Sequence, residues 1–184
     1  TASNPPPLVI VGAPGLAWSD LERDDLPALT ALVEQGASGS LTVRAVRSRS
    51  CAIDGWLTLS AGRRAGDLPG PCREPLPPVG GLVPYWSDYL AAAAADSYDA
   101  RPGLLAEAVA ASGACLQSSG AGAAIGAADP DGSVGSTYSD TVPTSVECPV
   151  VLVDAGALPV TQPERADAVA RLDAFVAQVV GAAP

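Results

Sequence analysis

Leu8-Val9-Ile10-Val11 is a continuous apolar run that follows three prolines and ends at Gly12. A short run without polar alternation, bounded by residues that interrupt regular structure, predicts a strand buried on both faces, as in a parallel sheet. Val150-Val151-Leu152-Val153 has the same pattern near the other end of the chain. The two runs therefore predict two central strands of one mainly parallel sheet.

Helical patterns separate these strands. Prolines suited to a first turn begin helices at Pro27 and Pro102, and glycines end them at Gly36 and Gly113. Residue spacing predicts further helices at 52–61, 86–95 and from Pro163 onward, a turn or short helix at 19–22, strands at 40–46, 115–118 and 123–127, and a turn at 129–132. Strands that alternate with helices predict a layered α/β domain.

The chain divides into an extended proline-rich segment at 1–7 and a single α/β domain at 8–184. Its 184 residues are enough for one domain with its own core. Residues 69–84 contain six prolines and three glycines. Because this density supports neither helix nor strand, it predicts a long proline-rich loop inside the domain.

The chain contains no histidine, lysine or methionine. Histidine is the commonest general acid–base group and metal ligand at neutral pH, so any chemistry must rely on carboxylates, hydroxyls, arginines or cysteines. A net charge of −10 argues against binding to nucleic acid or to anionic membranes. No apolar run reaches the length of about 18 residues that would span a membrane.

Four cysteines without a zinc-site spacing predict two disulfides in an oxidising compartment. Three connectivities are possible. The sequential one, Cys51–Cys72 and Cys115–Cys148, closes the shortest loops and is preferred. The chain begins at Thr1, which suggests a signal peptide or anchor upstream. We therefore expect a secreted protein or one on the extracytoplasmic face of the cell envelope, with a tether outside this chain as an alternative.

Two further segments, which follow the strand at 8–12, have distinctive sequence patterns. Residues 26–37 read P-x-L-x-x-L-x-x-x-G-A from Pro27 onward, and residues 48–65 carry W-x-T-x-x-x-G at Trp56, Thr58 and Gly62. With the strand at 8–12, they resemble the start of the alkaline phosphatase-like superfamily, which includes sulfatases and nucleotide pyrophosphatase/phosphodiesterases. The similarity is greatest to secreted or envelope members from actinobacteria. It implies an alkaline phosphatase-like fold, with residues 8–65 carrying the clear part of the resemblance.

The resemblance also implies a two-metal active site, and this chain has only some of the residues that such a site requires. Family members hold two metal ions and use an activated Ser, Thr or modified Cys, and Ser50 and Cys51 stand at that nucleophile position. An acidic ligand normally follows the first strand, but here the position holds Gly12. A later Asp-His-Gly is matched only by Asp154-Ala155-Gly156, which leaves Asp154 as a candidate metal ligand. The sulfatase pattern C-x-P-x-R is absent after Cys51.

Two other groups have a structural and a functional interpretation. Asp54 stands in the first turn of the predicted helix at 52–61, where a carboxylate stabilises the positive helix end, and its alternative role is that of a catalytic acid. Tyr85, Trp86 and Tyr89 follow the proline-rich loop. They either pack in the core or line a groove for a ligand or partner.

The sequence supports two functional hypotheses. The first is a non-catalytic secreted or envelope protein with a binding or assembly role, a pseudoenzyme without cofactor, whose partner the sequence does not identify. The second is a metal-dependent phosphoester or sulfate-ester hydrolase whose remaining ligands lie outside this chain. In the second, Ser50 or Cys51 is the nucleophile, Asp54 is an acid and Asp154 is a metal ligand.

Overall fold

The computed structural model describes residues 6–39, 45–46 and 48–183. Its sheet contains β1 (Leu8–Gly12), β4 (Val150–Asp154), β2 (Leu116–Ser119) and β3 (Tyr138–Ser139), in that spatial order. Every neighbouring pair is parallel. The predicted α/β class with a parallel sheet is confirmed, and the two apolar runs pair directly with each other. The prediction that both runs are central strands is wrong for β1, which stands at one edge of the described sheet and is only partly buried.

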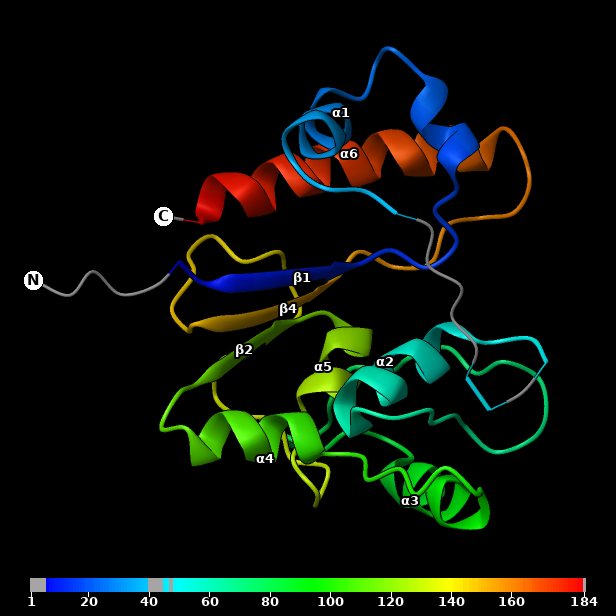
Figure 1. Cartoon of the computed structure of the whole chain (residues 1–184), viewed down its shortest axis with the longest axis vertical. Helices are drawn as coiled ribbons and strands as arrows, with labels where there is room; N and C mark the ends of the chain where they lie inside the picture. The colour runs from blue at the N-terminus through cyan, green and yellow to red at the C-terminus, as the bar shows by residue number, and fades with distance from the viewer. Residues whose placement is uncertain (1–5, 40–44, 47, 184) are drawn as a thin grey trace, which may run out of the picture.

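Helices cover both faces of the sheet (Figure 1). One face carries α1 (Pro27–Gln35) and α6 (Glu164–Ala182), and the opposite face carries α2 (Ala52–Ala61), α4 (Leu104–Ala111) and α5 (Ala121–Ala127). Helix α3 (Trp86–Ala95) lies beyond α2, away from the sheet, and a short 3-10 helix, η1 (Trp18–Glu22), follows β1. The observed helices at 52–61 and 86–95 have the predicted bounds.

Strand β4 is buried on both faces, which explains its unbroken apolar sequence. Leu152 packs in the core under α2 and α5, together with Ile53, Leu57 and Ile125. Its neighbours Val151 and Val153 point to the other face, where Val179 of α6 contacts them. Alternate side chains of β4 enter the cores on the two opposite faces of the sheet, so the side chains that point to either face are apolar.

Residues 123–127 form the last part of helix α5, so the strand predicted there is wrong. Short, wholly apolar runs do not distinguish a buried strand from a buried helix. Here alanine favours the helix. The chain also turns sharply at Gly120, whose φ of +88° is in the left-handed region that glycine accepts without strain.

Three further predictions, for residues 40–46, 129–132 and 69–84, have different outcomes. The strand predicted at 40–46 falls largely outside the described residues. The turn at 129–132 is confirmed by a hydrogen bond from the Gly132 N–H to the Asp129 carbonyl oxygen. Strand β3 was not expected, since two residues carry no detectable periodicity. Residues 69–84 contain no helix or strand apart from isolated bridges of Val79 with Leu82 and of Leu82 with Ser133.

Both disulfides have the sequential pairing. Cys115–Cys148 joins the residues just before β2 and β4, whose first residues, Leu116 and Val150, are paired in the sheet. This bridge therefore fastens the amino ends of two neighbouring strands. Among the described helices, none combines the length and apolar character needed to cross a lipid bilayer.

Candidate functional site

The carboxyl ends of β1 and β4 form the edge at which a functional site is expected. Gly12 ends β1, Asp154 ends β4, and the two are paired in register. In open parallel sheets, ligands bind outside the carboxyl ends of strands, because the loops and helix starts that follow converge there. We call this region the carboxyl edge.

The Asp154 carboxylate is half-buried at the carboxyl edge. Its Oδ2 accepts a hydrogen bond of 2.7 Å from the backbone N–H of Gly122, in the first turn of α5. Its Oδ1 accepts one of 2.9 Å from the N–H of Gly156. A carboxylate offers about four lone-pair sites, so each oxygen keeps acceptor capacity for a ligand.

The Trp56 indole lies in a slot between three glycines. A methyl group on Gly12 would stand 2.4 Å from Trp56 Cζ2, and one on Gly122 would stand 2.1 Å from Trp56 Nε1. A methyl on Gly126 would stand 3.1 Å from the same ring. Because Trp56 is only 5% exposed, this slot brings β1, α2 and α5 together behind the carboxyl edge.

A small cavity of about 190 Å³ opens at this edge. Its polar side chains are Trp56, Asp154 and Glu74, while Pro14, Pro75 and small alanines supply apolar walls. Apolar walls with a few convergent polar groups are typical of small-molecule sites.

A larger, open hollow of about 750 Å³ lies near the opposite end of the strands, beside the Cys115–Cys148 disulfide. Glu147 is the one titratable side chain among its described lining residues. We place the candidate site at the carboxyl edge because donor and acceptor groups converge there.

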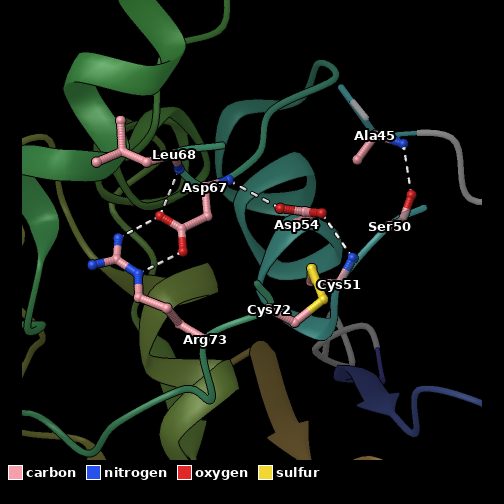
Figure 2. Close-up of a disulfide and its surroundings, with 8 residues drawn as sticks. All are labelled: Ala45, Ser50, Cys51, Asp54, Asp67, Leu68, Cys72 and Arg73. Atoms are coloured by element: carbon pink, nitrogen blue, oxygen red, sulfur yellow. Dashed lines mark hydrogen bonds and ion pairs between the residues drawn. A yellow bond between two sulfur atoms is a disulfide. The ribbon is translucent and has the colours of Figure 1, made fainter. Parts of the chain in front are cut away.

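Cys51 precedes the first residue of α2 and is joined to Cys72 of the long loop (Figure 2). A disulfide sulfur carries no thiolate, which is the nucleophilic form of cysteine. The structure therefore gives Cys51 the role of fastening the loop to the start of α2.

Asp54 lies in the first turn of α2 and is fully buried. Its Oδ2 accepts a hydrogen bond of 2.7 Å from the Cys51 N–H, and its Oδ1 accepts one of 2.9 Å from the Asp67 N–H. Figure 2 shows the carboxylate between these two backbone segments. Asp54 thus caps the helix and holds the loop, and it has no surface for a substrate.

Ser50 is half-buried and lies on the far side of Cys51 from the disulfide (Figure 2). Its hydroxyl oxygen accepts a hydrogen bond of 3.1 Å from the Ala45 N–H. Neither Ser50 nor Cys51 belongs with Asp154 among the cavity residues, although Ala52, the next residue along the chain, does. The sequence-predicted nucleophile and metal-ligand candidates therefore do not line one pocket.

Arg73, next to Cys72, binds side chains that come from the loop and from α3. It donates hydrogen bonds to both oxygens of the Asp67 carboxylate, one of 2.6 Å from Nε, and one of 2.8 Å to Asp88 of α3. Its guanidinium also lies 4.4 Å from the centre of the Tyr85 ring and 5.5 Å from that of Tyr89. These contacts raise the pKa of the Arg73 guanidinium, chiefly through the hydrogen bonds to Asp67.

Two of the three residues of the candidate aromatic groove are core residues. Trp86 and Tyr89 are 7% and 2% exposed and stand edge to face. The Trp86 indole N–H donates to the Pro130 carbonyl oxygen, and burial raises the pKa of Tyr89 to about 12. Tyr85 is half-exposed, with the Arg73 guanidinium over its ring.

The donor set does not fit the two metal ions that the family resemblance implies. Within the described residues, no three His, Cys, Asp or Glu side chains are placed to hold one ion. Asp54 is enclosed by backbone donors, and Gly12 offers no carboxylate next to Asp154. Zinc and calcium both require several oxygen, nitrogen or sulfur ligands around one point.

Sequence reasoning missed the parts of the cavity that depend on packing. Nothing in the sequence placed the ring edge of Trp56 beside Asp154. The spacing of Gly122 and Gly126, four residues apart and thus on one helical face, is the signal that marks a close approach. Glu74 comes from the loop, where no periodicity operates.

Comparisons of the chain with protein-family models, with curated proteins and with solved structures find no match.

Proposed function

We propose that this chain is a non-catalytic secreted or cell-envelope protein, of alkaline phosphatase-like fold, with a binding or assembly role. The parallel sheet, with its carboxyl edge formed by β1 and β4, is compatible with that fold. Within it, the residues at the positions of the family's chemistry hold the structure together.

The proposal depends on the bonding partners of Cys51 and Asp54 at the start of α2. Cys51 is oxidised to Cys72, and the buried Asp54 carboxylate binds two backbone N–H groups. With no histidine in the chain, the nucleophile has no imidazole base. A hydrolase would need these groups free, and breaking their contacts would release the long loop.

The two disulfides support an extracytoplasmic location. Disulfides persist in oxidising compartments and are reduced in most cytosols. The net charge of −10 favours solubility and disfavours contact with anionic polymers.

One observation favours the alternative, a metal-dependent phosphoester or sulfate-ester hydrolase completed by ligands outside this chain. Asp154 ends a central strand at the carboxyl edge, and both of its oxygens keep acceptor capacity. The same arrangement is suited to a binding site, which needs no further metal-ligating residues.

Hydrolysis of p-nitrophenyl phosphate and p-nitrophenyl sulfate, each with added Zn²⁺ or Ca²⁺, tests the proposal. We expect no release of p-nitrophenol above the buffer rate. Turnover that is lost in Asp154→Asn but kept in Asp131→Asn, an exposed carboxylate of the 129–132 turn, would establish the hydrolase instead. Turnover that survives in both variants would equally contradict a non-catalytic protein.

A further inference from the structure

The cavity at the carboxyl edge is lined by a largely buried side chain whose hydrogen-bond donor has no partner among the described residues. Trp56 is 95% buried and lines the cavity, and its indole N–H makes no hydrogen bond with any described residue. No fully buried polar side-chain atom in the described part of the chain lacks a partner, so this N–H is open to the cavity. Because no described residue accepts from it, this N–H is left to water or to the acceptor of a ligand that enters the cavity.

An acceptor stands beside this donor. The point where a methyl on Gly122 would lie is 2.1 Å from Trp56 Nε1 and 2.5 Å from Asp154 Oδ2. Two hydrogen bonds of about 2.8 Å from one atom can bridge groups about 5 Å apart. The indole N–H and the carboxylate therefore converge closely enough to bind one and the same ligand atom.

We propose that this cavity binds a hydroxyl-bearing neutral ligand, the end of a saccharide, with one hydroxyl bridging Trp56 and Asp154. A hydroxyl oxygen both donates and accepts, so it can accept from the indole and donate to the carboxylate. An ammonium group cannot accept from the indole, and an amide divides donor and acceptor between two atoms. This assignment rests on the proposed binding role.

The rest of the cavity supports the same ligand class. Glu74 adds a second carboxylate, which accepts a further hydroxyl and, with Asp154, repels anions. Pro14 and Pro75 offer apolar surface to the C–H groups of a sugar ring. The volume of about 190 Å³ is below the roughly 300–1,000 Å³ of drug-sized pockets, which suits a single ring.

NMR of the ¹⁵N-labelled chain reads the site directly, because its three tryptophans give three indole N–H signals. The probes are D-glucose, D-galactose, D-mannose, glycerol, N-methylacetamide and sodium D-glucuronate at pH 7. We expect at least one neutral hexose to shift the Trp56 signal saturably, with a dissociation constant of about 1 mM, as a few hydrogen bonds give. The signals of Trp18 and Trp86 should stay in place.

Two variants connect the shift to the cavity. Asp154→Asn should weaken hexose binding at least tenfold. Ala157→Leu, at an exposed cavity-lining position, should abolish it, whereas Val160→Leu, in the same loop but outside the cavity, should not change it. The second pair keeps the test valid if Asp154→Asn fails to fold.

The proposal is overturned if no hexose shifts the Trp56 signal, or if Ala157→Leu leaves the shift unchanged. An equal response to glycerol or N-methylacetamide would overturn the assignment to a saccharide. An equal response to D-glucuronate would overturn the role of the carboxylates. Each of these results leaves the absence of hydrolysis untouched, so failure of the ligand assignment is distinct from failure of the proposed function.

Discussion

The Arg73 guanidinium binds both oxygens of the Asp67 carboxylate, and these two residues flank Cys72 in the sequence. Asp67 is nearly buried, and its backbone N–H donates to Asp54 in the first turn of α2. The loop is thus fastened to the start of α2 twice, by the Cys51–Cys72 disulfide and by the contact of Asp67 with Asp54.

Asp67→Asn should destabilise the fold by about 2 kcal/mol. Breaking a fully buried ion pair costs about 3–5 kcal/mol, and the Arg73 side chain, which is 30% exposed, recovers part of this through water. Urea unfolding measures the change. Asp99→Asn, in the exposed pair with Arg63, is the matched control and should leave the midpoint where it is. Equal midpoints for both variants would show that the loop does not depend on Arg73.

Gly122→Ala should cost about 2 kcal/mol or more, because its methyl would stand 2.1 Å from Trp56 Nε1 and 2.5 Å from Asp154 Oδ2. Gly55→Ala, in α2, meets nothing within 4 Å and should stabilise the protein by about 0.5–1 kcal/mol through helix propensity. Thermal unfolding of the two variants separates them. A stable Gly122→Ala protein would mean that the Trp56 slot is wider than described.

Removing either disulfide should lower stability by about 3–4 kcal/mol, since the bridges close loops with sequence separations of 21 and 33 residues. Cys51→Ala/Cys72→Ala should also loosen the long loop, which is then held to α2 by the contact of Asp67 with Asp54, while Cys115→Ala/Cys148→Ala should not. Limited proteolysis within 62–85 distinguishes the two. Faster cleavage after loss of Cys115–Cys148 would contradict the separate roles.

Asp20 should make stability sensitive to acid. Two hydrogen bonds from the Arg165 guanidinium hold the pKa of the Asp20 carboxyl below its usual range. A lowered folded-state pKa contributes stability above about pH 4, and this stability is lost as pH falls through the folded value. Asp20→Asn should therefore be less stable at pH 7 and lose less on acidification to pH 2. Urea midpoints at both values check this, with Asp131→Asn expected to match the wild type.

The sequence was sufficient to predict an element where its local residue pattern matches its surroundings in the folded protein. β4 is apolar throughout because both of its faces are covered, and α2 has the expected bounds because Asp54 accepts from the Cys51 N–H at its start and Gly62 ends it in the left-handed conformation. The order of the cysteines favoured the observed pairing through loop length alone.

The rest depended on contacts between distant residues. Helix α5 was mistaken for a strand because its burial hides any amphipathic pattern, and its glycines are explained only by the Trp56 ring that they admit. Arg73 gave no sequence signal, because its partners Asp67 and Asp88 come from separate segments. Likewise, no spacing placed Trp56 and Asp154, nearly a hundred positions apart in the numbering, at one cavity.

Metal stoichiometry of the intact, disulfide-bonded protein tests the central claim most directly. The protein is dialysed to equilibrium against micromolar Zn²⁺, and bound zinc per chain is measured by inductively coupled plasma mass spectrometry. Because Gly12 stands where a carboxylate would be needed and Asp54 is enclosed, we predict no stoichiometric zinc. Two zinc ions per chain, lost in Asp154→Asn, would contradict a non-catalytic protein.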